Sequence, residues 1–329
     1  MDLSTIMGLL QNASELGLFS SLTVLALFLS YTMLNVCDLS TDGCYTLGAV
    51  TGAVVAMAGH PFLSIPAAMA AGVISGFVTA FLQTRMGINS LLAGIIVNTG
   101  LYSVNIALMG NTALLNMNKT ETVFTLLKEA LGNTALAGQY KLIVALIAVA
   151  AVIAIEALFL RTRLGLALRA TGNNPDMVRA SSINPATMTV IGLCIANAFT
   201  ALSGCLLAQS QKSVNIDIGS GMVTVALASL LIGNAFMGRG SIPRRATGAV
   251  LGAIIFRVVY MLALRFKMPA FMLKFVSSVI VIIAISGPYL KEQMPMIRRK
   301  ADRRQTGTRG RQNLNDSSDA MTAEKGTVR

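Results

Sequence analysis

The sequence offers few side chains that could carry out chemistry. One histidine and four cysteines are spread over 329 residues, too few for a Cys/His zinc site or a disulfide framework. These residues are His60, Cys37, Cys44, Cys194 and Cys205. We expect an interfacial loop position for the histidine and small apolar packing roles for the cysteines. No metal site is predicted, and an intramembrane hydrolase is disfavoured because the spans hold no paired nucleophile and base.

Nucleotide chemistry is not expected in this chain either. The sequence lacks the pattern Gly-x-x-x-x-Gly-Lys-Ser/Thr, whose backbone N–H groups cradle the phosphates of ATP. We therefore predict that the chain binds no cofactor and is not itself an enzyme.

The composition indicates a membrane protein. Hydrophobic residues make up 54% of the chain and charged residues 12%, and the mean hydropathy is +0.68, which is too apolar for a soluble surface. The net charge of +12 is typical of nucleic-acid binders, but the first 84 residues contain neither Lys nor Arg. The cations gather between or after apolar runs, where they report orientation in the membrane. Nucleic acid is not an expected partner.

Apolar runs of about 20 residues, the length that crosses a bilayer, predict an all-α polytopic membrane protein with about nine transmembrane helices, within a range of eight to ten. The runs cover roughly 16–34, 44–59, 62–84, 89–110, 141–160, 187–209, 222–238, 246–264 and 269–287. Residues 1–15 are predicted to form an interfacial segment, 16–290 the transmembrane domain, and 291–329 a disordered, basic cytoplasmic tail that meets anionic headgroups.

The loop charges orient these spans, because short cytoplasmic loops carry an excess of Lys and Arg. Placing the N-terminus outside and the C-terminus in the cytoplasm puts most loop arginines inside. They are Arg85, Arg161, Arg163, Arg169, Arg179, Arg239, Arg244 and Arg245.

Two similar stretches predict an internal repeat. Ser64-Ile65-Pro66 precedes two glycines, Gly72 and Gly76, and Ser241-Ile242-Pro243 precedes Gly248 and Gly252. The predicted orientation gives the stretches opposite polarity, as in the inverted repeats of transporters, which place a substrate route where the halves meet near mid-membrane. The alternative is chance, because small residues recur wherever membrane helices pack closely.

The segment 161–186 between the fifth and sixth spans has the features of a docking site. Asn174-Pro175-Asp176 is a helix-start signal, and the residues after it can form a short helix parallel to the membrane. Such a helix suits a soluble partner, although an ordinary solvated loop is the alternative.

At these residues the chain resembles the permease subunits of ATP-binding-cassette importers, in the branch that moves branched-chain amino acids, ribose and related sugars. The resemblance rests on the following motifs. They are Arg169-Ala-Thr-Gly172-Asn, Ala180…Ile183-Asn, Gly219-Ser-Gly221, Leu231-Ile232-Gly233, Gly238-Arg-Gly240-Ser and, near the front, Leu39-Ser-Thr-Asp42-Gly43, which looks like the family's first re-entry toward the membrane. The resemblance covers roughly residues 20–287 and looks closest to an uncharacterised-transport-system branch sometimes linked to aromatic amino acids. Relatives often carry Gly before the Ile-Asn turn, whereas this chain has Ser181-Ser182, which leaves the pitch of the coupling helix open.

This resemblance implies a permease of the bacterial inner membrane that works by alternating access in a binding-protein-dependent importer. The implied partners are a second permease subunit, in a homodimer or heterodimer, two cytoplasmic ATPases that hold ATP and Mg, and an extracytoplasmic substrate-binding (lipo)protein. The implied coupling residues are Arg169, Gly172, Asn173, Asn174, Pro175, Asp176, Arg179, Ala180 and Ile183. An amino acid, aromatic ones included, or a similar small polar solute is the expected substrate; a sugar or nucleoside is the alternative.

Polar residues inside the spans mark a candidate substrate pathway, because unpaired polar groups are costly in hydrocarbon. They are Asn98, Tyr102, Asn105, Asn197, Thr200 and Asn234. The spacing of the first three puts them on one helix face. Hydrogen bonding between helices is the alternative of equal weight.

Four cations near the predicted outer surface form a candidate rim for docking the binding protein or attracting a substrate carboxylate, with snorkelling as the alternative. They are Arg257, Arg265, Lys267 and Lys274. Glu156, near the end of its span, is expected to face the membrane interface or Arg161.

A secondary transporter or channel without an ATPase is the rival function. A proton-coupled carrier typically buries a carboxylate near mid-membrane, whereas the sequence places its acids in loops, in the tail and at the end-of-span Glu156. The importer is therefore preferred.

Overall fold

The computed structural model describes residues 3–131, 139–238, 240–265, 275, 278–282 and 286. Contacts divide the chain into two units, Met1–Val281 and Ile282–Arg329. Its helices are α1 (Leu3–Leu27), which continues into the π-helix η1 (Phe28–Met33), α2 (Thr41–Met57), α3 (Ser64–Thr84), α4 (Ser90–Leu108), α5 (Val123–Leu131), α6 (Tyr140–Phe159), α7 (Arg163–Asn173), α8 (Pro175–Ala180), α9 (Pro185–Gln211), α10 (Met222–Met237) and α11 (Ile242–Arg265). Strands β1 (Leu114–Asn116) and β2 (Ser213–Asn215) pair antiparallel.

The predicted helical, multi-span architecture is confirmed in its coarse form, since the described residues are mostly helical and form one short two-stranded sheet. Among the described residues, six helices are long and apolar enough to cross a membrane. They cover Gly8–Met33, Ser64–Thr84, Ser90–Leu108, Tyr140–Phe159, Pro185–Gln211 and Ile242–Ala263. The second and seventh predicted spans form the shorter helices α2 and α10, and most of the ninth, 269–287, lies outside the described residues. The count of nine and the orientation stay predictions.

Of the two predicted terminal segments, only the N-terminal one, 1–15, falls largely within the described residues. Residues 3–15 are continuous with α1 and form no separate element. The tail, 291–329, lies outside the described residues.

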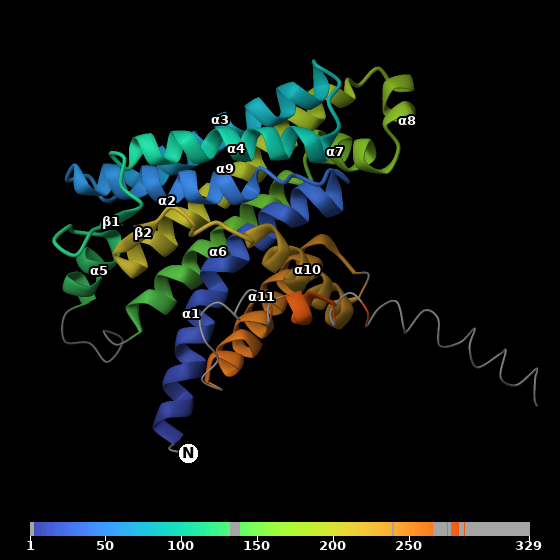
Figure 1. Ribbon diagram of the computed structural model, residues 1–329. Coiled ribbons are helices and arrows are strands. Elements are labelled where there is room, and N and C mark those ends of the chain that lie inside the picture. The colour runs from blue at the N-terminus through green and yellow to red at the C-terminus, as the bar shows by residue number, and fades with distance from the viewer. Residues whose placement is uncertain are drawn as a thin grey trace, which may run out of the picture. The chain divides into compact units, whose positions relative to one another are not determined.

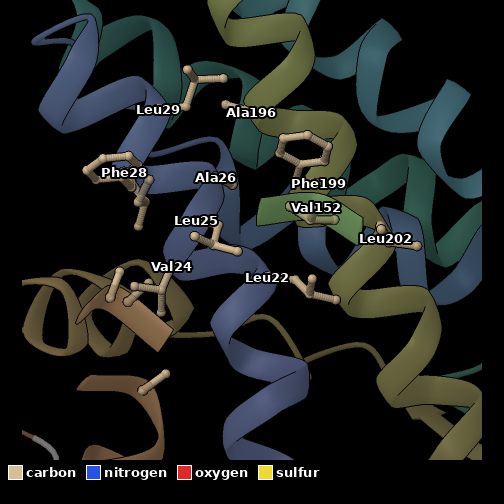
Figure 2. Packing of buried hydrophobic residues seen from close by; sticks show 14 of the residues in the cluster. Leu22, Val24, Leu25, Ala26, Phe28, Leu29, Val152, Ala196, Phe199 and Leu202 are labelled. Carbon is tan, nitrogen blue, oxygen red and sulfur yellow. The ribbon is translucent and has the colours of Figure 1, made fainter. Parts of the chain in front are cut away.

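The core joins the long helices α1, α6 and α9. Large side chains of α1 and η1, such as Leu25 and Leu29, pack against Phe199 of α9 and Val152 of α6 (Figure 2). All four are buried to at least 97%, with exposed fractions from 0% to 3%. Because lipid tails are as apolar as these side chains, close van der Waals packing in this cluster, and not removal of the side chains from water, holds α1, α6 and α9 together.

The two halves exchange their packing partners. The helix α9 packs extensively on α2 and α3 of the first half, and α1 packs on α10 and α11 of the second, while α1 and α9 also contact each other. This reciprocal arrangement pairs α1, α2 and α3 with α9, α10 and α11 as corresponding helices of a repeat, and the inverted polarity of that repeat stays a prediction. The arrangement supports the predicted repeat more strongly than the Ser-Ile-Pro similarity does.

The glycines of the two similar stretches both allow close helix packing, but against different helices. A Cβ at Gly72 or Gly76 would overlap backbone of α9, whereas a Cβ at Gly252 would overlap the carbonyl of Ser229 in α10. Only glycine fits at these positions, because the two helix backbones touch there and leave no space for a side chain. The glycine spacing therefore reports close packing in each half and is not by itself a mark of the repeat.

Candidate functional site

Two short helices begin inside the helical bundle and meet at their N-termini. After η1 the chain turns back, and the Asp38 carboxylate accepts a hydrogen bond from Asn197 Nδ2 at 2.9 Å. Asn197 lies in the middle of α9, roughly 18 Å along that helix at about 1.5 Å per residue. The helix α2 therefore starts about halfway along α9, and it runs toward the end where α3 begins.

Asp42 of α2 caps the start of α10. Its Oδ2 accepts a hydrogen bond from the Gly221 N–H at 2.9 Å, and its Oδ1 accepts one from the Val223 N–H at 2.8 Å. A carboxylate at a helix N-terminus is favourable because the unpaired N–H groups carry partial positive charge. The residue was missed as a functional candidate, because an acid in a first helical turn indicates a cap of its own helix.

The buried acids correct one argument made from the sequence. Asp38 is 2% exposed and also accepts a hydrogen bond from the Ser40 N–H at 2.8 Å. Asp38 and Asp42 thus lie inside the bundle, where the sequence analysis expected no carboxylate. The error arose because residues 34–40 are short and polar enough to read as an external loop. The absence of a buried acid can no longer be used against a proton-coupled carrier.

The first three pathway residues do share one face. Asn98 and Tyr102 of α4 line a cavity of about 390 Å³ together with Asn105, Asp42 and Asp217. The amide of Asn105 is buried and donates to the Gly43 carbonyl at 3.2 Å, and Tyr102 is 50% exposed. The predicted common face is confirmed, and a role in transport stays a prediction.

The other three pathway residues lie elsewhere. Asn197 and Thr200 are buried within α9, where Asn197 bonds Asp38 and Thr200 donates to the Ala196 carbonyl. Asn234 is half-buried near the C-terminal end of α10, and its backbone carbonyl accepts a hydrogen bond from the Gly238 N–H. None of the three lines the cavity beside α4.

Arg257 of α11 points into a second cavity. Its Nε and Nη2 donate to Ser20 Oγ at 3.0 Å and 2.6 Å, and its guanidinium lies 6.0 Å from the centre of the Tyr260 ring. The cavity, of about 430 Å³, is also lined by Gly221 and Phe256. This setting differs from the open rim expected from the sequence. Lys267, Lys274 and the side chain of Arg265 lie outside the described residues.

The predicted docking segment forms two helices with different roles. In α7, Leu168 is buried, and a Cβ at Gly172 would overlap the carbonyl oxygen of Met33. The helix α7 is thus seated directly on the end of η1. In α8 only Val178 is buried, so α8 projects from the bundle (Figure 1).

The predicted coupling residues lie mainly on this projection. Asn174 Oδ1 accepts from the N–H groups of Asp176 and Met177, each at 3.1 Å, as the helix-start signal predicts. Seven of the predicted residues are exposed, namely Arg169, Asn173, Asn174, Pro175, Asp176, Arg179 and Ala180, and Gly172 and Ile183 are half-buried. Arg179 pairs with Asp176 at 3.4 Å. Met177, 65% exposed, was missed, because a lone methionine in a loop gives no signal.

The Ser181-Ser182 departure coincides with a special backbone conformation. Ser182 has φ 60°, in the left-handed region that favours glycine. The helix α8 is an ordinary α-helix that ends at Ala180, and the Ile183 N–H reaches back to the Val178 carbonyl at 3.2 Å. The open question of its pitch is thereby answered: the serine is accommodated at the turn, and α8 keeps regular geometry.

The arginine-bearing loops gather at one end of the bundle. Arg85 and Asn184 line a shared cavity, and Arg245 lies over the Phe28 ring at 5.5 Å from its centre. In Figure 1, α7 and α8 lie at this end, whereas β1, β2 and α5 lie at the opposite one. The loops assigned to the cytoplasm by charge are therefore on one side.

The expectation for Glu156 is wrong. Its side chain is 1% exposed, neither carboxylate oxygen has a hydrogen-bond partner in the described part of the chain, and Arg161 is exposed. Glu156 belongs to the buried face of α6, because its spacing from Val149 and Val152 places it on that stripe.

Of the cysteines, all four are free, and Cys44 and Cys205 are buried.

The sequence is similar to proteins of known classes over most of its length. Residues 10–285 match the model of the family described as "Branched-chain amino acid transport system / permease component". The chain is 29% identical over 268 residues to the tyrosine transport system permease protein of Clostridioides difficile, covering 81% of this chain and 86% of the relative.

Of two further relatives, one has a name that gives no function and the other is named for sugar import. An uncharacterized protein of Rickettsia prowazekii is 32% identical over 229 residues, covering 69% of this chain and 77% of the relative. The galactose/methyl galactoside import permease protein of Escherichia coli is 29% identical over 188 residues, covering 57% of this chain and 54% of the relative. No solved structure matches this chain significantly. With the family model spanning nearly all of the helical unit, the chain belongs to the family of branched-chain amino acid transport system permease components.

Proposed function

We propose that this chain is the transmembrane permease subunit of an ATP-driven, binding-protein-dependent importer for a small polar solute. The observation that carries the proposal is the match of residues 10–285 to the permease family. The meeting of α2 and α10 at Asp42, inside the bundle and beside two cavities, supports a transport path but is equally suited to an ATP-driven and to a secondary transporter. Helices interrupted near mid-membrane, with their N-termini facing one another, are the usual framework of a transport site. Irregular backbone is tolerated at that depth only where it is buried or lines a cavity.

An amino acid is the preferred substrate. The relative named for tyrosine transport is matched over 81% of this chain and 86% of its own length, compared with 57% and 54% for the galactose permease. A sugar or a nucleoside is the alternative, because the amides and hydroxyls of the α4 cavity suit such solutes equally well.

The helix α8 is the proposed contact with the cytoplasmic ATPases, of which the complete importer has two. Its exposed Met177 offers an adaptable apolar anchor, flanked by the charged pair Asp176 and Arg179. The helix α7 links this contact to the bundle, because Gly172 rests against Met33 at the end of η1. A push on α8 would therefore reach α1, and through α1 the second-half helices α10 and α11 that pack on it.

In this proposal the remaining partners are a second permease copy and an extracytoplasmic binding protein, in the bacterial inner membrane. The loops of the α8 end would face the cytoplasm, since that end carries the loop arginines. Alternating access would then be a rocking of the two halves about the α1–α9 contact.

The test is the capture of the ATPase by a tagged permease. Met177→Asp should abolish co-elution of the ATPase, because it puts a charge into the apolar contact. Met86→Asp is the matched control, since Met86 is 62% exposed, compared with 65% for Met177, and lies at the same end but outside α8. Loss of the ATPase in both variants, or in neither, would refute the coupling role of α8.

A secondary transporter is the second candidate, because Asp38 and Glu156 are carboxylates buried to 2% and 1% exposure. Such acids mark proton pathways in carriers. Uptake into vesicles that contain the permease alone, driven by a proton gradient without ATP, would establish this candidate in place of the importer.

A further inference from the structure

Arg257 is a half-buried cation within the bundle, and its hydrogen-bond partner is neutral. Its hydrogen bonds go to the hydroxyl of Ser20, at 3.0 Å and 2.6 Å, and within the described residues no carboxylate forms an ion pair with it. A charge at membrane depth is costly unless something compensates it, and such residues mark substrate or ion pathways. One hydroxyl group does not neutralise a guanidinium, and the cavity of about 430 Å³ beside Arg257 has the volume for a small anion.

The depth of Arg257 matches the meeting point of the two half-helices. The cavity that it lines also touches Gly221 and Met222, the start of α10, and Gly221 is bonded to Asp42. The cation therefore faces the same level as the proposed transport site. The N–H groups of α10 are already occupied by Asp42, which leaves Arg257 as the group available for an anion.

Two aromatic rings stand beside the cation. Phe256 and Tyr260 are stacked, with their centres 6.5 Å apart and their planes inclined by 17°, and the guanidinium lies 6.0 Å from the Tyr260 ring centre. Both rings line the cavity. A planar guanidinium favours bidentate binding of a carboxylate, and the rings favour an apolar or flat group next to that carboxylate.

The neighbouring cavity carries the opposite charge. Ser220 lines both cavities, and Asp42 and Asp217 line the one beside α4. A neutral sugar can accept hydrogen bonds from a guanidinium but carries no charge to neutralise it, whereas a carboxylate does both.

We infer that Arg257 binds the carboxylate of the transported amino acid. The inference rests on the proposed importer function with its amino-acid substrate, and it names the residue that recognises this substrate. It also assigns Arg257 to the translocation path.

The experiment uses the complete importer, with ATPases and binding protein, reconstituted in liposomes. Uptake of the common amino acids, tested singly, and of galactose and ribose is measured with and without ATP. The inference expects ATP-driven uptake of at least one amino acid. It also expects Arg257→Gln to lower that uptake roughly 10- to 100-fold, the loss that follows from removing a charge-assisted hydrogen bond. Arg85→Gln, an exposed arginine outside both cavities, should transport at the wild-type rate.

Folding damage is separated from lost recognition by two readouts. ATPase activity stimulated by the ligand-free binding protein should be unchanged in Arg257→Gln. Ser20→Ala removes the hydrogen-bond partner and keeps the cation, so it should retain uptake. A loss in Ser20→Ala equal to that in Arg257→Gln would assign Arg257 a purely structural role and overturn the inference. If Arg257→Gln does not fold, Arg257→Lys decides: a partial loss of uptake supports the inference, and an unchanged rate overturns it.

The failures are distinguishable. Wild-type uptake at full rate by Arg257→Gln, or wild-type transport of galactose or ribose alone, overturns the inference and leaves the importer standing. Absence of any ATP-driven uptake by the wild type defeats the proposed function itself, and the inference with it.

Discussion

The carboxylate of Asp42 accepts hydrogen bonds from the N–H groups of Gly221 and Val223, and so joins helix starts that lie 179 residues apart in the chain. Asp42 is the second residue of α2, and Gly221 is the N-cap of α10. Each half of the molecule therefore contributes one interrupted helix to the same point. A shift of one half relative to the other would stretch or break this contact.

Asp42→Ala should destabilise the protein by about 1–3 kcal/mol, because two backbone donors lose a charged acceptor. Thermal unfolding in detergent is the measurement. Asp217→Ala is the control, since the Asp217 side chain is exposed and caps no helix start. Equal unfolding temperatures for Asp42→Ala and the wild type would show that the cap does not hold the halves together.

Gly172→Val should disrupt the packing of α7 against the end of η1. Its side chain would overlap the Met33 carbonyl, so α7 must move or the end of η1 must give way, at a cost of about 1–3 kcal/mol. We expect reduced ATPase capture and a lower unfolding temperature. Gly100→Ala is the matched control, because a Cβ there has nothing within 4 Å; it should be neutral or slightly stabilising. Normal coupling in Gly172→Val would disprove the proposed path from α8 to α1.

Ser182→Gly should stabilise the turn after α8 by up to about 1 kcal/mol, since φ 60° is strained for a residue with a side chain. ATPase capture should be retained, because α8 itself is unchanged. Ser181→Gly provides the contrast: with φ −88° it gains nothing and should be neutral or destabilising. A lower unfolding temperature for Ser182→Gly than for Ser181→Gly would contradict this reading of the backbone.

Glu156→Gln should be neutral or stabilising in thermal unfolding, because it removes a buried carboxylate that lacks a partner in the described residues, and such a group costs free energy. In the importer, ATP-driven uptake should persist in this variant. Abolished uptake with normal folding would point instead to a proton pathway through Glu156 and favour the secondary transporter.

Single-cysteine labelling tests the orientation. The four native cysteines are free and are first replaced by alanine. Ala180→Cys, in exposed α8, should react with a membrane-impermeant maleimide only after the cells are opened, whereas Asn118→Cys, beside β1 at the opposite end, should react in intact spheroplasts. The reverse pattern would place the loop arginines outside and remove α8 from the reach of any cytoplasmic ATPase.

Local signals in the sequence were enough for several features. Apolar length identified the long helices, the spacing of Asn98, Tyr102 and Asn105 placed them on one face, and Asn174-Pro175-Asp176 identified the start of α8. Each of these depends on residues within a few turns of one another, so propensity, periodicity and capping determine them without reference to the rest of the chain.

Tertiary structure decided the rest, because it depends on which segments meet. Nothing local distinguishes Asp42 as the cap of a helix 179 residues away, turns Arg257 from a surface rim toward Ser20, or buries Glu156 on the inner stripe of α6. Hydropathy averages over a window and cannot see that the chain re-enters the bundle at residues 34–40. The physical reason is that in a membrane a polar group is stabilised by whichever partner the packing of distant helices brings to it.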